Sequence, residues 1–186
     1  METYLDAGAG LKKMFIASIG IVICTVLLIV PGINLVAAVA TIVLGILSLV
    51  GLYQAGKDIE GCKKAFFLTI AKLVLSGLGN VAQSVMMALI VTLATYIVDV
   101  LVVYLVCTSV SEITEKLGQS SIADKGRLTW KLYLGCYIAV VVLAVLMVIP
   151  SLLGVALVAG LATTLFSVVA MILYTIFLYQ SSNALQ

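Results

Sequence analysis

The chain has 186 residues, of which 64% are hydrophobic and only 10% are charged, and its mean hydropathy is +1.32. A soluble domain carries about 25% charged residues, so this chain has too few polar side chains to cover a water-facing globule, and its main partner is expected to be the lipid bilayer. The net charge of +2 is too small for the basic surface that binds nucleic acid. Histidine is absent from the chain, which excludes His-dependent catalytic triads, proton relays and metal ligands.

Six apolar stretches follow one another along the chain, each close to the ~20 residues that a helix needs to cross a ~30 Å hydrocarbon layer. They run at about 14–30, 33–53, 65–82, 84–106, 132–149 and 152–178. Because the apolar runs are continuous and do not alternate with polar residues, they predict helices and not the strands of a barrel. The expected fold class is therefore all-α: a polytopic transmembrane bundle of six helices in one integral membrane domain, residues 1–186.

Two kinds of break separate the apolar stretches. Short, uncharged breaks lie at 30–34, 77–84 and 149–154, and longer, charged breaks lie at 54–64 and 107–131. Lys72 is the one Lys or Arg outside the N-terminal arm and the charged breaks. If every stretch crosses the membrane, both termini and both charged breaks share one side, which the positive-inside rule makes cytoplasmic. The sequence thus predicts a multi-pass protein of a bacterial-type inner (cell) membrane with cytoplasmic N- and C-termini.

The third stretch is the most polar of the six. A rival interpretation makes 64–82 an interfacial helix and leaves five crossings. An internal repeat favours six: Lys13 and Lys64 are 51 residues apart, and Pro31 and Pro150 are 119 residues apart. The repeat predicts three helical hairpins at about 13–53, 64–106 and 131–179, with a cytoplasmic helical loop at 107–131.

The repeat also predicts which residues face the interior of the bundle. A stripe of small residues in the second helix has counterparts in the fourth and sixth: Ala37, Thr41, Gly45 and Ser48; Ala88, Thr92, Tyr96 and Asp99; Ala156, Gly160, Thr164 and Ser167. Small residues in membrane helices mark helix contacts because they let backbones approach. We therefore expect leucine at Thr41 or Gly160 to overpack a helix contact.

Asp99 is a carboxylate inside an apolar run that has no other charge from Val85 to Ser111. An ionised aspartate at mid-membrane costs about 2.5–3.5 kcal/mol, so it should face the bundle interior and find a partner. Lys72 is the other intramembrane charge, and each of the two lies about 12 Å from the nearer charged break at 1.5 Å per residue. Both are therefore expected at similar depth on neighbouring helices.

A polar stripe at helical spacing surrounds Lys72 in the third stretch: Thr69, Lys72, Ser76, Asn80 and Gln83. A polar face is costly in lipid, so the stripe should point inward. Three interpretations of Asp99 stay open. It forms a structural ion pair with Lys72; or Lys72 snorkels to the cytoplasmic interface and leaves Asp99 bonded to hydroxyls; or Asp99 and the stripe line a path for an ion, proton or small polar solute.

The segment 107–131 is expected to hold two short helices. The first would be capped by Ser109 or Ser111 and stop at Gly118; the second would begin at Ser120 or Ser121 and end near Gly126.

The sequence contains no catalytic motif, and its four cysteines form no Cys-x-x-Cys pair. We therefore expect no enzyme activity, no cofactor and no metal site. The expected function is that of a channel, carrier or substrate-capture subunit for an ion or small solute. The alternative is a non-transporting membrane subunit that acts by interaction, as an assembly factor, sensor or effector, and either form could pair with itself or with another membrane subunit. In length and six-helix plan the chain is similar to the substrate-capture subunits of energy-coupling-factor vitamin transporters, although no motif accompanies this likeness.

Overall fold

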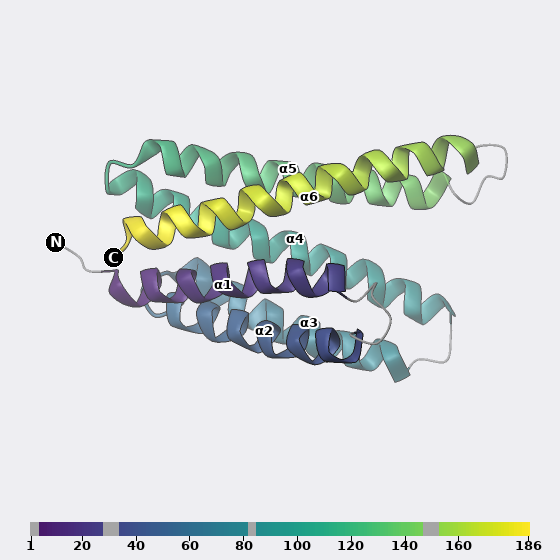
Figure 1. Ribbon diagram of the computed structural model, residues 1–186, viewed down its shortest axis with the longest axis horizontal. Helices are drawn as coiled ribbons and strands as arrows, with labels where there is room; N and C mark the ends of the chain where they lie inside the picture. The colour runs from purple at the N-terminus through teal and green to yellow at the C-terminus, as the bar shows by residue number, and fades with distance from the viewer. Residues whose placement is uncertain (1–3, 28–33, 82–84, 147–152) are drawn as a thin grey trace.

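The computed structural model describes residues 4–27, 34–81, 85–146 and 153–186, and these residues form six α-helices without a strand (Figure 1). The helices are α1 (Leu5–Leu27), α2 (Asn34–Ala55), α3 (Glu60–Val81), α4 (Val85–Lys116), α5 (Ser120–Leu146) and α6 (Leu153–Ala184). The predicted all-α bundle of six helices is confirmed. Five helices hold a described segment long and apolar enough to cross a membrane, and α3 is not among these five. The sixth crossing therefore stays a prediction.

The six helices run along the long axis of the molecule as three antiparallel pairs, α1 with α2, α3 with α4 and α5 with α6 (Figure 1). Each helix packs against the next one in the chain, and α6 returns to pack against α1, so the bundle forms a ring. Both described chain ends and the connections 56–59 and 117–119 lie at one end of this ring, which we call the charged end. The opposite end, where α1 ends and α2 begins, is the uncharged end.

The hydrophobic core lies at the charged end. One cluster of buried side chains joins the start of α1, the end of α2, the start of α3, the last third of α4 and the end of α6. Its buried members are Ala7, Leu11, Met14, Leu52, Ala55, Ile59, Cys62, Ala65, Val106, Cys107, Val110, Phe177, Leu178 and Leu185. From α5, Ile122 and Trp130 pack against this cluster. The helices are thus tied together at one end of their length.

Two glycines allow α1 and α2 to approach with backbone in contact. A Cβ atom on Gly10 would lie 2.5 Å from the carbonyl oxygen of Gly51 and 2.5 Å from the amide nitrogen of Ala55. A Cβ atom on Gly51 would lie 2.7 Å from the carbonyl oxygen of Gly10. All three atoms belong to the backbone and cannot move aside as a side chain could, so this contact requires glycine at both positions.

The segment 107–131 differs from the prediction of a loop with two separate helices. It is helical, but its two parts continue α4 and α5 without a break, and only 117–119 lies between them. Gly118 ends α4 as predicted, with φ of 78° and the Gln119 N–H donating to the Thr114 carbonyl at 2.8 Å, which is the hydrogen bond of a Schellman motif. Gly126 ends nothing, because α5 runs through it; a Cβ atom there would meet the Phe177 ring at 2.6 Å.

The predicted helix contact at Gly160 is wrong for the described residues. A Cβ atom on Gly160 or on Gly45 would meet no described atom within 4 Å. Ala37 is buried, with 2% of its surface exposed, but the side chains of Ala88 and Ala156 lie outside the described residues. Among the described residues close packing is concentrated at the charged end, and Gly45 and Gly160 lie outside that packed region.

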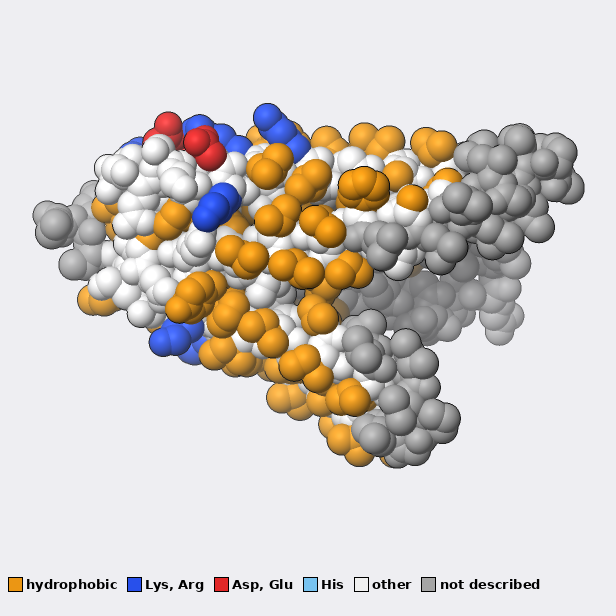
Figure 2. Space-filling view, turned by 45° about the horizontal axis from the view of Figure 1, so that its top comes forward, with side chains coloured by type: hydrophobic (Ala, Val, Ile, Leu, Met, Phe, Trp, Pro, Cys, Tyr) orange, Lys and Arg blue, Asp and Glu red, His pale blue; other side chains and the backbone are white. Residues whose placement is uncertain are grey.

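Large apolar side chains cover the outer surface of the bundle beyond the charged end (Figure 2). Among the most exposed are Leu35 at 74%, Ile42 at 65%, Phe166 at 63% and Ile97 at 62%. Exposed apolar patches of this extent are rare on soluble monomers. Lys, Arg, Asp and Glu side chains gather at the charged end in the same view. This division matches a protein whose apolar belt faces lipid.

The Gly10 contact predicts opposite effects for one substitution at two glycines. Gly10→Ala should lower stability by about 1–3 kcal/mol, because the methyl group overpacks a backbone contact. Gly45→Ala should be neutral or stabilising by up to ~1 kcal/mol, because alanine is the better helix former and has free space. Thermal unfolding of detergent-solubilised protein, followed through the single tryptophan, Trp130, measures both. Equal effects of the two substitutions would contradict the predicted packing.

Candidate functional site

Lys72 and Asp99 are in direct contact. The Lys72 ammonium on α3 donates a hydrogen bond to Asp99 Oδ1 on α4 at 2.5 Å. The side chains are 32% and 30% exposed, so the pair is neither on the outer surface nor sealed in the core. Asp99 precedes the core residue Val106 by seven residues, or two helical turns, and so lies on the same inward face of α4. The structure thus brings together the two charges that the sequence placed at equal depth.

Tyrosines of α5 lie in the neighbourhood of Asp99. The Asp99 carboxylate acts electrostatically on the phenols of Tyr133 and Tyr137. The Tyr137 ring packs against Tyr96 of α4, with ring centroids 5.7 Å apart. Asp99 is therefore bonded to a cation of α3 and lies near phenol groups of α5.

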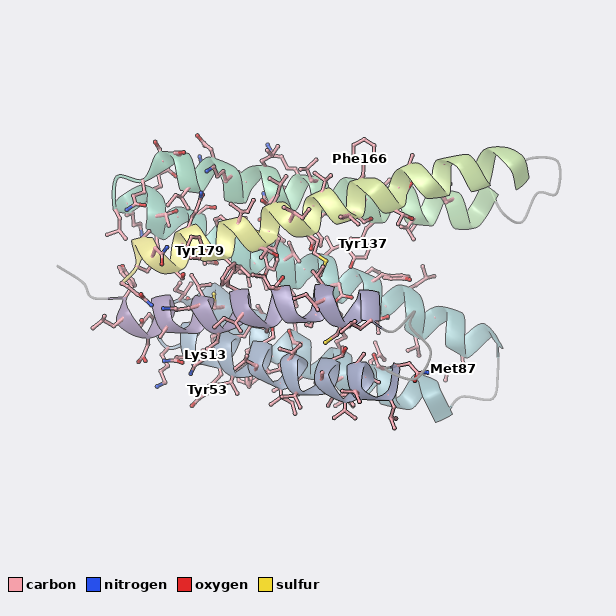
Figure 3. All side chains as sticks on the ribbon, in the orientation of Figure 1. Lys13, Tyr53, Met87, Tyr137, Phe166 and Tyr179 are labelled. Carbon is pink, nitrogen blue, oxygen red and sulfur yellow. The ribbon has the colours of Figure 1, made fainter. Side chains whose placement is uncertain are left out.

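A cavity of ≈ 250 Å³ lies beside these tyrosines, between α5 and α6. It is lined by Tyr133, Cys136, Tyr137, Val140, Ser167, Ala170 and Met171. Tyr137, labelled in Figure 3, lines this cavity and also packs against Tyr96 of α4, three residues before Asp99. The Ser167 hydroxyl donates to the Thr163 carbonyl of its own helix at 2.9 Å and leaves its lone pairs available to a bound group.

The cavity lies beyond the packed core, toward the uncharged end. Ser167 precedes the core residue Phe177 by ten residues, which is ~15 Å along a helix. Between these levels α6 is joined to α1 by a hydrogen bond between the hydroxyls of Ser18 and Thr175 at 2.9 Å. The Phe15 and Tyr179 rings, 5.1 Å apart, make a further contact nearer the charged end. The ring of helices is therefore closed on the charged side of the cavity.

The polar stripe of α3 is only partly described. The Thr69 hydroxyl donates to the Ala65 carbonyl of its own helix at 2.8 Å, and Ser76 is half-buried. The Asn80 side chain and the whole of Gln83 lie outside the described residues. Among the described side chains of the stripe, Lys72 is bonded to another helix, whereas Thr69 is bonded within α3.

Sequence reasoning missed the part that Tyr133 and Tyr137 play. Neither tyrosine was among the residues that the sequence predicted for the site, because a tyrosine in an apolar stretch carries no charge that would mark it. Their i, i+4 spacing puts both on one helix face, and this was the available signal. In the structure Tyr133 also packs against Tyr174 of α6, with ring centroids 5.8 Å apart.

Among the described residues no group of three or more His, Cys, Asp or Glu side chains could hold a metal ion. The cysteines are free: Cys24, Cys62 and Cys107 are buried, and Cys136 is half-buried at the cavity. No protein-family model, curated protein or solved structure matches the chain.

Removing either charge of the Lys72–Asp99 pair should destabilise the bundle. Lys72→Met and Asp99→Asn should each cost about 1–3 kcal/mol, between the values for exposed and for buried pairs, because each strands the partner's charge. The double variant should recover most of the loss, since it leaves no unpaired charge. Thermal unfolding in detergent tests this with a double-mutant cycle, and purely additive losses would contradict the coupling.

The exposed pair Glu60–Lys64, 2.8 Å apart on the same helix α3, provides the matched control. Its side chains are 79% and 63% exposed. Glu60→Gln and Lys64→Met should leave the unfolding temperature unchanged within error.

Proposed function

We propose that this protein is a small multi-pass membrane protein that binds or passes an ion or small polar solute, as a channel, carrier or substrate-capture subunit. The observation that carries the proposal is the position of the Lys72–Asp99 pair, which faces inward and borders a cavity through Tyr137. Charged groups inside a membrane bundle are costly and are typical of solute pathways.

The chemistry of the site favours a solute with both a donor and an acceptor group. Asp99 and Lys72 together carry no net charge, so a bare cation would have to compete with Lys72 for the carboxylate. A neutral or zwitterionic solute can instead bond to both members of the pair. The phenols of Tyr133 and Tyr137 and the Ser167 hydroxyl add neutral hydrogen-bonding groups in the cavity wall.

The proposed orientation places the charged end in the cytoplasm. Nine of the ten Lys and Arg residues lie outside the apolar stretches, and in the structure the charged connections share one end. By the positive-inside rule this end faces the cytoplasm of a bacterial-type inner membrane. The cavity then lies on the outer side of the packed core, which suits capture of a solute from outside.

A second candidate is a non-transporting subunit that acts by contact with another membrane protein. An apolar groove of ≈ 500 Å³ between α4 and α5 favours it. The groove is lined by Leu93, Tyr96, Ile97, Val100, Leu101, Leu134, Tyr137, Ile138, Val141 and Val142. A partner helix could seat its apolar face there, in which case the interior of the bundle should be dry.

Native cysteines distinguish the two candidates. Because Cys136 lines the cavity, a small membrane-impermeant methanethiosulfonate should modify it when added from the side of the uncharged end. Cys107, which is 0% exposed, should stay unmodified and serves as the internal control. Peptide mass spectrometry reports both sites, and Cys136→Ser should abolish the signal. Modification of Cys136 only after denaturation would mean a dry interior and would favour the interaction subunit.

Retention of a bound solute should depend on the Lys72–Asp99 pair. Mass spectrometry of protein solubilised in mild detergent should find a bound ion or small polar molecule in the wild type. The double variant Lys72→Met/Asp99→Asn, which removes both charges, should retain at least tenfold less of it, while Glu60→Gln/Lys64→Met should retain the wild-type amount. Equal retention in both double variants would contradict a role of the pair in binding.

A further inference from the structure

A groove of ≈ 210 Å³ opens between α2 and α3 at the boundary of the charged end and the apolar belt. It is lined by Tyr53, Gly56, Lys57, Lys63, Phe66 and Phe67. The groove lies far from the solute site along the helices, since Lys63 precedes Lys72 by nine residues, or ~13 Å. Among the described residues, α2 and α3 have less contact with each other than any other two consecutive helices.

The turn between α2 and α3 holds the two lysines of the groove in place. Its backbone is bonded, with the Gly56 N–H donating to the Leu52 carbonyl at 2.8 Å and the Ile59 N–H to the Ala55 carbonyl at 3.0 Å. Gly56 lies against α3, because a Cβ atom there would be 2.9 Å from the Lys63 backbone. Lys57 on this turn and Lys63 in the first turn of α3 therefore line one groove.

The positive charge of the two lysines is poorly compensated. Lys63 forms no salt bridge among the described residues and acts on Glu60 only as a more distant charge. The Lys57 contact with Asp6 is long, at 3.7 Å, and about half exposed. The nearby acids are engaged elsewhere: Asp58 accepts the Ala7 N–H at 2.8 Å. The hydrogen bond from Lys64 holds the pKa of Glu60 below its ordinary value. The groove thus presents ammonium groups that an external anion can bind.

The opposite side of the groove is aromatic. Phe66 packs between Tyr53 and Phe67, with ring centroids 5.5 Å and 5.6 Å away. Tyr53 and Phe67 stay 58% and 59% exposed. Exposed apolar residues continue both helix faces toward the uncharged end: Ile46 and Val50 on α2, Ile70 and Val74 on α3. A ligand that fits has an anionic head and a long apolar tail.

We propose that this groove binds one anionic phospholipid, with its phosphate between Lys57 and Lys63 and an acyl chain over Phe67. Lysines at the membrane surface attract anionic lipid headgroups, and exposed aromatic rings at the interface pack against the upper part of the chains. The inference requires membrane insertion and is independent of whether the cavity binds a solute.

Native mass spectrometry of the full chain in detergent tests the lipid site, by titration with dioleoyl phosphatidylglycerol and, as the neutral counterpart, dioleoyl phosphatidylcholine. The first phosphatidylglycerol should bind at least tenfold more tightly than phosphatidylcholine. Lys57→Gln and Lys63→Gln should each weaken phosphatidylglycerol binding about fivefold, as expected for one surface lysine. Equal affinity for the two lipids would overturn the proposal.

The matched control is Lys116→Gln/Lys131→Gln, which removes the same amount of charge from exposed positions outside the groove. It should leave phosphatidylglycerol affinity within twofold of the wild type, whereas Lys57→Gln/Lys63→Gln should lower it by more than tenfold. Equal losses in the two double variants would show a diffuse charge effect and overturn the site. All four lysines are exposed, so the variants should fold, which an unchanged unfolding temperature verifies.

The apolar part of the site has its own test. Phe67→Ser should weaken phosphatidylglycerol binding at least threefold. The soluble headgroup glycerophosphoglycerol should show no binding at concentrations that saturate the lipid. Tight binding of the soluble headgroup would identify a soluble phosphate compound as the ligand and overturn the lipid assignment.

Discussion

Close packing at the charged end is the constraint on which the rest of the structure depends. Helices in lipid gain little from burying apolar surface against one another, so their association needs close backbone approach and good packing. The chain supplies both here: Gly10 meets Gly51, and Gly126 meets Phe177. All six helices contribute to this one region. Because they are joined there, their other halves need not be packed to the same density.

The charged pair lies at the edge of this packed region. Lys72 follows the core residue Ala65 by seven residues, and Asp99 precedes the core residue Val106 by seven, so both lie ~10 Å from the core. Inside the core an ion pair would be fully desolvated at a cost that often exceeds its attraction. On the outer surface it would face lipid. At the edge of the core, where the two side chains are 32% and 30% exposed, the pair avoids both of these costs.

The sequence was sufficient for the six helices, because each long apolar run is separated from the next by a break of turn-forming or charged residues. The helical rise of 1.5 Å per residue also placed Lys72 and Asp99 at one depth, and in the structure the two side chains are in contact. The sequence could not locate the core. Membrane helices are apolar on all sides, so nothing in the sequence separates Gly10, which is in contact, from Gly160, where a Cβ atom would meet no described atom within 4 Å. Tyr133 was missed because a tyrosine near the end of an apolar stretch is typical of an interface anchor, and Tyr137 because it carries no charge that marks a site.

The structural and the functional interpretations of Asp99 are linked through α3. Lys72 ties α3 to α4, while on its other side α3 meets α2 along the seam with the least contact among the described neighbours. A solute that bonds to Asp99 must share or replace the ammonium of Lys72, and it therefore weakens or reshapes the tie between α3 and α4. A ligand can shift a conformation only by its difference in affinity between two arrangements, and an ion pair that is present in one arrangement and open in the other provides such a difference. Among the described residues α3 is therefore held in the bundle chiefly by α4, and the Lys72–Asp99 pair is part of that attachment.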